Sequence, residues 1–139
     1  MRVIYRDGTM AECPKEEEVH ILRHTAAHIM AQAVKRLYPH AKFSYGPADD
    51  QGFYYDVDFG DTKLSKDDLS AIEAEMRKIV KENLPIKPLT LPRSEAIALM
   101  RQRGEDYKAE YIGDLPDNAV ISFYRQGEYT DLCVGPHLC

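Results

Sequence analysis

The strands near the end of this chain lie too close together for a helix to connect them. Residues 120–124 and 129–132 read as strands, and Gln126-Gly127 predicts a turn between them. Parallel neighbours need a crossover of roughly a dozen residues or more, so these two strands must pair antiparallel. Because helical patterns alternate with extended segments upstream, we predict an α+β fold in which helices pack on one side of an antiparallel β-sheet.

Further segments carry the periodicity of helices. Residues 22–37 repeat apolar side chains every three or four positions and stop at Pro39, and Ser65 with Asp68 resembles a capping box that opens the next helix. Another helix is predicted from Ser94, as N-cap, to Gly104. We expect one stripe of the first helix to be buried, while the acidic run 16–18 stays in water. That stripe consists of Leu22, Ala26, Ile29, Ala33 and Leu37.

Shorter signals place the remaining extended segments. Asp7-Gly8 is a hairpin turn signal, so residues 1–14 are predicted to form a short N-terminal hairpin and residues 15–139 the main domain. Residues 53–59 alternate apolar or aromatic side chains with polar ones. This alternation predicts a strand with one aromatic face turned inward.

The chain has the size of one domain and a slight excess of acidic residues. It has 139 residues and a formal net charge of −5, whereas domains that bind nucleic acid through phosphates usually have a basic excess. Any contact with nucleic acid should therefore be local or shared with a larger assembly. The longest uncharged, mostly apolar stretch covers ten residues, 25–34, which is short of the roughly 20 needed to span a bilayer. With three cysteines a disulfide framework is a poor explanation, so we expect a cytoplasmic protein with no membrane partner.

Two pairs of potential ligands lie far apart in the sequence. His24 and His28 are four residues apart in the first predicted helix, which places both rings on one face. Cys133 and His137 have the same spacing near the end of the chain. Together they match the ligand set of a tetrahedral zinc site. The alternative is that the histidines are merely partly buried and Cys133 is a small buried hydrophobe. A metalloprotease pattern is excluded, because Thr25 stands where His-Glu-x-x-His requires glutamate.

Three further polar residues could belong to a site. Asp131 lies two positions before Cys133, so in an extended segment both face the same side, where a carboxylate can orient an imidazole or hold an ammonium. Lys108 is surrounded by carboxylates, and its neighbours favour a solvated surface charge. Tyr55 lies on the apolar face of its strand, where core packing is the default interpretation.

Five blocks together resemble the editing domain of bacterial-type threonyl-tRNA synthetases, in the order found in that family. They are His24-Thr25-Ala26-Ala27-His28, Gly46-Pro47, residues 52–58 (Gly-Phe-Tyr-Tyr-Asp-Val-Asp), residues 104–108 (Gly-Glu-Asp-Tyr-Lys) and residues 131–137 (Asp-Leu-Cys-Val-Gly-Pro-His). The histidine and cysteine pairs alone also fit the related alanyl-tRNA editing domains, but the third and fifth blocks favour the threonyl branch. Nothing resembles an aminoacylation core or an anticodon-binding domain, so the chain resembles an excised or freestanding editing module.

The resemblance implies hydrolysis of the ester in mischarged seryl-tRNA(Thr), and it gives each matching residue a role. His24 would activate or position the attacking water, with the help of Lys108. The other catalytic residues would line the pocket around the terminal adenosine ester; they are His28, Cys133 and His137. The seryl group would contact the substrate-binding residues Gly46, Tyr55 and Asp131, of which Asp131 is suited to its ammonium.

The resemblance also bears on cofactors and partners. The threonyl branch edits without a bound metal, whereas the alanyl branch uses one. We therefore expect no required cofactor, with zinc on His24, His28, Cys133 and His137 as the alternative. Two other functions stay open: a freestanding zinc-dependent alanyl-type deacylase that acts on seryl-tRNA(Ala), and a noncatalytic zinc-stabilised module that docks tRNA. The expected partners are the 3′ acceptor end of tRNA(Thr) carrying serine and, if the natural chain is longer, the remaining synthetase domains.

Overall fold

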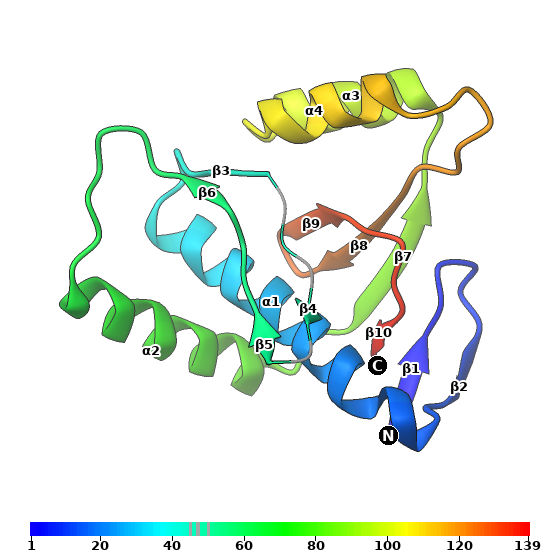
Figure 1. The fold of residues 1–139 in the computed structure, drawn as a ribbon, viewed down its shortest axis with the longest axis horizontal. Coiled ribbons are helices and arrows are strands. Elements are labelled where there is room, and N and C mark those ends of the chain that lie inside the picture. The colour runs from blue at the N-terminus through cyan, green and yellow to red at the C-terminus, as the bar shows by residue number, and fades with distance from the viewer. Residues whose placement is uncertain (45, 47, 50) are drawn as a thin grey trace.

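The computed structural model describes residues 1–44, 46, 48–49 and 51–139, and there the chain alternates helices with short strands (Figure 1). The helices are a 3₁₀ turn, η1 (Lys15–Glu17), and α1 (Glu18–Leu37), α2 (Lys66–Glu82), α3 (Arg93–Gln102) and α4 (Asp106–Asp114). The strands are β1 (Arg2–Ile4), β2 (Met10–Glu12), β3 (Lys42–Phe43), β4 (Ala48–Asp49), β5 (Gly52–Phe53), β6 (Val57–Asp58), β7 (Ile86–Thr90), β8 (Ser122–Gln126), β9 (Tyr129–Leu132) and β10 (His137–Leu138). The strands pair antiparallel, which confirms the predicted α+β class.

In place of one sheet, the described residues form several small ones. Their strand orders are β10-β1-β2, β7-β8-β9, β3-β6 and β4-β5. Many of these strands have only two residues, which is too short to support a wide sheet. The predicted N-terminal hairpin is present as β1 and β2. Its first strand also pairs with β10, so the hairpin shares a sheet with the end of the chain.

Strand β8 has helices over both of its faces, whereas the sequence predicted helices on one side of the sheet. Phe123 is buried in a cluster with Met100 of α3 and Ile112 of α4. Gln126 points to the opposite face, where its amide donates a hydrogen bond to Gln32 of α1 at 2.6 Å. In Figure 1 the β7-β8-β9 sheet accordingly lies between the α3–α4 pair and α1. This arrangement brings the C-terminal segment against α1, where the candidate site forms.

The buried stripe predicted for α1 is wrong. Leu22 and Leu37 are 52% and 38% exposed, and of the five predicted residues only Ala33 is fully buried. The buried face of the helix is partly polar, and its polar members are Thr25, His28 and Gln32. Because these side chains have buried partners, the apolar periodicity alone selected the wrong face. The acidic run is in water as expected at Glu16 and Glu17 and is half-buried at Glu18.

Local signals predicted the other elements with mixed accuracy. The N–H of Ser65 donates to the carboxylate of Asp68 at 2.8 Å, which confirms the capping box of α2. Helix α3 begins at Arg93, before the predicted N-cap Ser94, and its end is confirmed near Gly104, whose φ of +74° lets the chain turn. Helix α4, which follows at once, was not predicted. Residues 53–59 do not form one strand: Phe53 ends β5, Val57 and Asp58 form β6, and the others lie outside both, although the alternation of burial is as predicted. Pro47 of the second resemblance block lies outside the described residues.

Candidate active site

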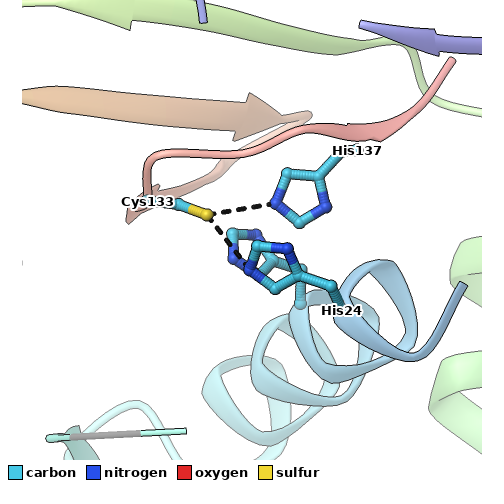
Figure 2. A group of neighbouring side chains, drawn as sticks. His24, Cys133 and His137 are labelled. Carbon is cyan, nitrogen blue, oxygen red and sulfur yellow. Dashed lines mark hydrogen bonds between the residues drawn. The ribbon is translucent and has the colours of Figure 1, made fainter. Parts of the chain in front are cut away.

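Side chains from both halves of the chain meet at one point. His24 and His28 project from α1, one turn apart, while Cys133 follows β9 and His137 lies in β10. Their potential ligand atoms all lie within 4.8 Å of one another. Figure 2 shows Cys133 and His137 of the C-terminal segment turned toward His24. The expected convergence of the two pairs is therefore confirmed.

Cys133 links the members of this cluster. Its Sγ lies 3.2 Å from Nε2 of His24 and 3.3 Å from Nε2 of His137. The sulfur also accepts a hydrogen bond from the N–H of Gly135 at 3.2 Å. On the other side of its ring, Nδ1 of His137 lies 3.0 Å from Oγ1 of Thr25. Thr25 thus fixes the His137 ring with Nε2 toward the sulfur.

Burial sets the protonation of the cluster. It lowers the pKa of His28 to about 4 and that of His137 well below 6.5, and it also lowers the pKa of His24. The same burial raises the pKa of the Cys133 thiol to about 12. At neutral pH the cluster therefore consists of neutral imidazoles, each with one nitrogen that carries a lone pair, and a protonated thiol.

The cluster is also able to hold a metal ion. Imidazole nitrogen and thiolate sulfur are both zinc ligands, and separations up to 4.8 Å exceed those in a zinc tetrahedron by up to about 1.5 Å, so the side chains would have to draw together around an ion. Thr25 contacts Nδ1 of His137, the ring nitrogen that faces away from Cys133. Metal-bound histidines usually have such a hydrogen-bonding partner on the nitrogen that does not bind the metal. To become a ligand, Cys133 would have to lose its proton.

A second polar group lies beside the first. Lys108 of α4 forms an ion pair with Asp131 of β9, and its ammonium also donates to the hydroxyl of Tyr55 at 2.5 Å. The Tyr55 hydroxyl in turn donates to Asp131 at 2.8 Å. Nε2 of His28 lies 3.4 Å from the same carboxylate oxygen, which joins the two groups. The side chains of Lys108 and Asp131 are 5% and 0% exposed, so the interpretation of Lys108 as a solvated surface charge is wrong.

Asp131 stays ionised although it is buried. Burial would raise the pKa of Asp131, but the Lys108 ammonium, His28 and two hydrogen bonds outweigh it, and the pKa lies below its usual value. Burial raises the pKa of Tyr55 well above 10, so its phenol keeps the proton that it donates. The Asp131 carboxylate therefore keeps its negative charge in the ion pair with Lys108, withdrawn from water.

Both groups form the inner end of a cavity of about 720 Å³. The predicted site residues that line it are Gly46, His24, His28, Tyr55, Lys108 and Cys133. Asp131 and His137 lie behind this lining and hold it through the contacts above. A Cβ at Gly46 would come within 2.7 Å of the Tyr55 ring, so glycine is required for the ring to occupy its place. The structure thus brings all eight predicted residues together.

The outer part of the cavity is aromatic and apolar. Tyr107 and Tyr111 of α4, Val120 before β8 and Val134 after β9 line it, and all four are exposed. A concave apolar surface with a few polar groups at one end is typical of small-molecule and cofactor sites. Such a cavity suits a ligand with a flat apolar part and a polar reactive end.

Glu105 is a site-supporting residue that the sequence did not reveal. It is 4% exposed, accepts a hydrogen bond from the N–H of Phe43 at 2.9 Å, and pairs with Lys35 of α1 at 2.7 Å. Glu105 directly precedes α4 and so ties the helix that carries Lys108 to β3 and α1. The ring of Phe43 packs against Tyr55, with 4.7 Å between ring centres. The sequence gives no sign of this role, because the neighbouring Asp106 is equally acidic and is exposed.

Several known proteins similar to this chain are threonine--tRNA ligases. A threonine--tRNA ligase of Clostridioides difficile is 58% identical over 123 residues, which cover 88% of this chain. One of Clostridium botulinum is 51% identical over 140 residues, covering 99%, and one of Clostridium acetobutylicum is 57% identical over 117 residues, covering 84%. The chain is a homologue of one region of the threonine--tRNA ligases. It spans about a fifth of the length of these relatives, 18–22%.

The similarity supports the resemblance recognised from the sequence blocks. Threonine--tRNA ligases are aminoacyl-tRNA synthetases, so the chain is related to enzymes of protein biosynthesis. No family model matches the chain. In the part of the chain that the structure describes, no helix is long and apolar enough to cross a membrane.

Proposed function

We propose that this domain hydrolyses the ester of seryl-tRNA(Thr), releasing serine and intact tRNA. The observation that carries the proposal is that one cavity presents both a neutral imidazole, His24, and a buried ammonium, Lys108. Ester hydrolysis needs a base for the attacking water and a positive charge near the oxygen that becomes negative. The similarity to threonine--tRNA ligases supports tRNA(Thr) as the carrier.

His24 would be the general base. As the pKa of His24 is lowered, its ring is neutral at pH 7 and can take a proton from water. The water would attack the ester carbon, and the imidazolium would then return the proton to the departing ribose oxygen. His28, Cys133 and His137 would hold the His24 ring and the ester in place.

Lys108 would act as a fixed positive charge. Its pairing with Asp131 and Tyr55 holds the ammonium at the inner end of the cavity, where it can donate to the water or to the developing oxyanion. The ammonium of the seryl group would lie at the Tyr55 hydroxyl. Asp131, on the far side of that hydroxyl from the cavity, would attract it. The expected contact of Asp131 with the seryl ammonium stays a prediction.

Discrimination against threonine would come from the Tyr55 ring. A site that selects threonine for aminoacylation rejects serine by only about 1–3 kcal/mol, because serine lacks a single methyl group. A second, hydrolytic site is therefore needed to remove serine that has been attached to the tRNA. Contacts with Gly46 and Phe43 fix the ring of Tyr55, and a rigid wall can exclude the additional methyl of threonine. The reaction would take place in the cytoplasm. The domain would act there with the other domains of a synthetase.

Zinc would be held by His24, His28, Cys133 and His137. Four protein ligands close a tetrahedral site, so zinc would lower the pKa of a water to about 7 only if one of the four left its position open. Under our proposal it is not required, because His24 and Lys108 supply the base and the positive charge.

The proposal is tested by incubating the domain with seryl-tRNA(Thr), threonyl-tRNA(Thr) and seryl-tRNA(Ala) and measuring the released amino acid. We expect rapid release from the first substrate alone. Preferred cleavage of seryl-tRNA(Ala) with a zinc requirement would indicate an alanyl-type deacylase. Binding of tRNA without release from any substrate would indicate a docking module.

A further inference from the structure

A second hollow adjoins the mouth of the active-site cavity. It has a volume of about 430 Å³ and lies between the β1–β2 turn and β7, lined by Arg6, Asp7, Gly8, Val120 and residues 88–90. Arg6 and Val120 also line the active-site cavity. The two hollows therefore share a wall, and a ligand too long for the first can continue into the second.

The position of Arg6 relative to the active site is fixed by backbone pairing. Arg6 follows β1, and in that strand Ile4 pairs with His137 of the cluster. The hydroxyl of Tyr124 donates to the carbonyl of Ile4 at 3.0 Å, and the N–H of Tyr5 donates across the turn to Thr9 at 2.9 Å. A short strand tied on two sides thus holds the arginine at the cavity mouth.

The charges around the mouth are unequal. Of the two cationic side chains that line the cavity, Lys108 is paired with Asp131, whereas Arg6 has no ion pair with any carboxylate of the described residues. Asp7 beside it is engaged in its own turn, where its carboxylate accepts from the N–H and hydroxyl of Thr9 at 2.9 and 2.6 Å. The α4 side of the cavity carries Glu110 and Asp114. The hairpin side thus has one guanidinium to set against one carboxylate, whereas the α4 side, apart from the paired Lys108, has carboxylates alone, so a polyanion that leaves the cavity is directed toward the hairpin.

We propose that Arg6 binds a phosphodiester of the RNA strand whose 3′ end carries the ester. This inference rests on the proposed function, which places that end in the cavity. The strand leaves over Val120, which is 54% exposed and offers an apolar surface to a ribose or base, and enters the second hollow. The planar guanidinium of arginine fits two phosphate oxygens at once, and here no internal carboxylate competes for it.

The test measures binding of a fluorescently labelled CCA trinucleotide to the wild-type protein, to Arg6→Gln and to Arg2→Gln. Arg2 is an exposed arginine of the same hairpin that lines neither hollow. We expect Arg6→Gln to weaken binding about tenfold, as for one charged hydrogen-bonded contact, and Arg2→Gln to leave it unchanged. The slope of log K against log salt should fall by about 0.7 on loss of one single-strand phosphate contact. Equal binding by the wild type and Arg6→Gln, equal weakening in both variants, or no binding to the wild type would overturn the proposal.

Hydrolysis assays separate this proposal from the proposed function. Seryl-adenosine has no phosphodiester, whereas the seryl ester of CCA has two. Arg6→Gln should reduce kcat/KM for the trinucleotide ester about tenfold and leave seryl-adenosine unaffected. If the wild type cleaves neither ester but binds CCA through Arg6, the hydrolytic function fails while the phosphate site stands. If both esters are cleaved and neither depends on Arg6, the reverse holds.

Discussion

Lys108 and Asp131 form a buried ion pair in which the lysine comes from α4 and the aspartate from β9. With side chains 5% and 0% exposed, neither charge has access to water that could replace its partner. The pair thus connects the α4 side of the cavity to the central sheet, and it positions the positive charge to which we assign a catalytic role.

Replacement of Asp131 by asparagine is predicted to cost stability as well as activity. The near-isosteric change leaves the Lys108 ammonium buried without its counter-charge, which should lower the free energy of unfolding by about 3 kcal/mol. The double variant Asp131→Asn/Lys108→Met removes both charges and should recover part of that loss. Urea unfolding of the wild type and the variants measures both effects. A single variant as stable as the wild type would contradict the prediction.

Replacement of His24 by asparagine is predicted to slow deacylation of seryl-tRNA(Thr) about 10²- to 10⁴-fold, the usual contribution of a general base. His20 lies one turn earlier on α1 and is exposed, so His20→Asn is the matched control and should retain nearly full activity. The pH dependence of kcat/KM should have its acidic limb below 6.5, because the pKa of His24 is lowered by burial. A limb above pH 7, or equal loss in both variants, would exclude His24 as the base.

The buried histidines are predicted to make the fold sensitive to acid. His28 has a pKa of about 4 in the folded state against about 6.5 when unfolded. Between these values the unfolded chain binds a proton that the folded one does not, so stability is full above pH 6.5 and is lost as the pH falls toward 4. For His28 the loss amounts to about 3 kcal/mol, and His137 should add to it.

Unfolding in urea at several pH values tests this expectation. The variant His28→Asn should flatten the dependence by about one proton. The same substitution at the exposed His40 is the control for removal of a histidine from the surface. Constant stability from pH 7 to pH 5 would show that the histidines are not buried in the neutral form.

Adjacent acidic residues are predicted to differ sharply in importance. Glu105→Gln breaks the pair with Lys35 and should cost about 3 kcal/mol of stability together with activity, because the start of α4 loses its attachment. Asp106→Asn breaks only the exposed pair with Lys42 and should cost less than about 1 kcal/mol. Unfolding and deacylation measured side by side on the two variants check the difference. Equal effects would mean that Glu105 does not position Lys108.

Removal of metal is predicted to leave deacylation unchanged. Under our proposal the lone pair of His24 accepts a proton, so zinc on the cluster would occupy the base and inhibit. Metal analysis of the purified protein, with activity measured before and after chelation and after addition of zinc, tests this. Loss of activity on chelation that zinc restores would instead assign the cluster to a catalytic metal.

The sequence predicted those parts of the structure that local chemistry determines. The capping box at Ser65 and Asp68 depends on neighbours a few residues away, and α2 was predicted correctly. The β8–β9 hairpin was also predicted, but its turn lies at Gly127-Glu128, one residue after the predicted Gln126-Gly127, and β8 covers 122–126 in place of 120–124. The buried face of α1 depends instead on partners far along the chain, such as His137 for Thr25. Apolar periodicity carries no information about such partners, so the wrong face was chosen.

The same contrast between local signals and distant partners explains which parts of the site were predicted. The spacing of the histidine and cysteine pairs predicted that they would meet, but the burial of Lys108 could not be derived from its acidic neighbours. It follows from the position of Asp131, which is 23 residues away and pairs with it only in the folded sheet. Helix α4 was missed because its nine residues make only about two and a half turns, which is too short for a helical period to stand out.

The pairing of β1 with β10 has a consequence for the order of folding. The contact between Thr25 and His137 spans 112 residues, and that between Ile4 and Tyr124 spans 120. Contacts of this length close late, because their loop entropy must be offset by structure already formed. Helices α1 and α2 and the β8–β9 hairpin can form earlier from local signals. Catalytic competence is therefore expected to be the last property that the chain acquires as it folds, after most of its secondary structure is in place.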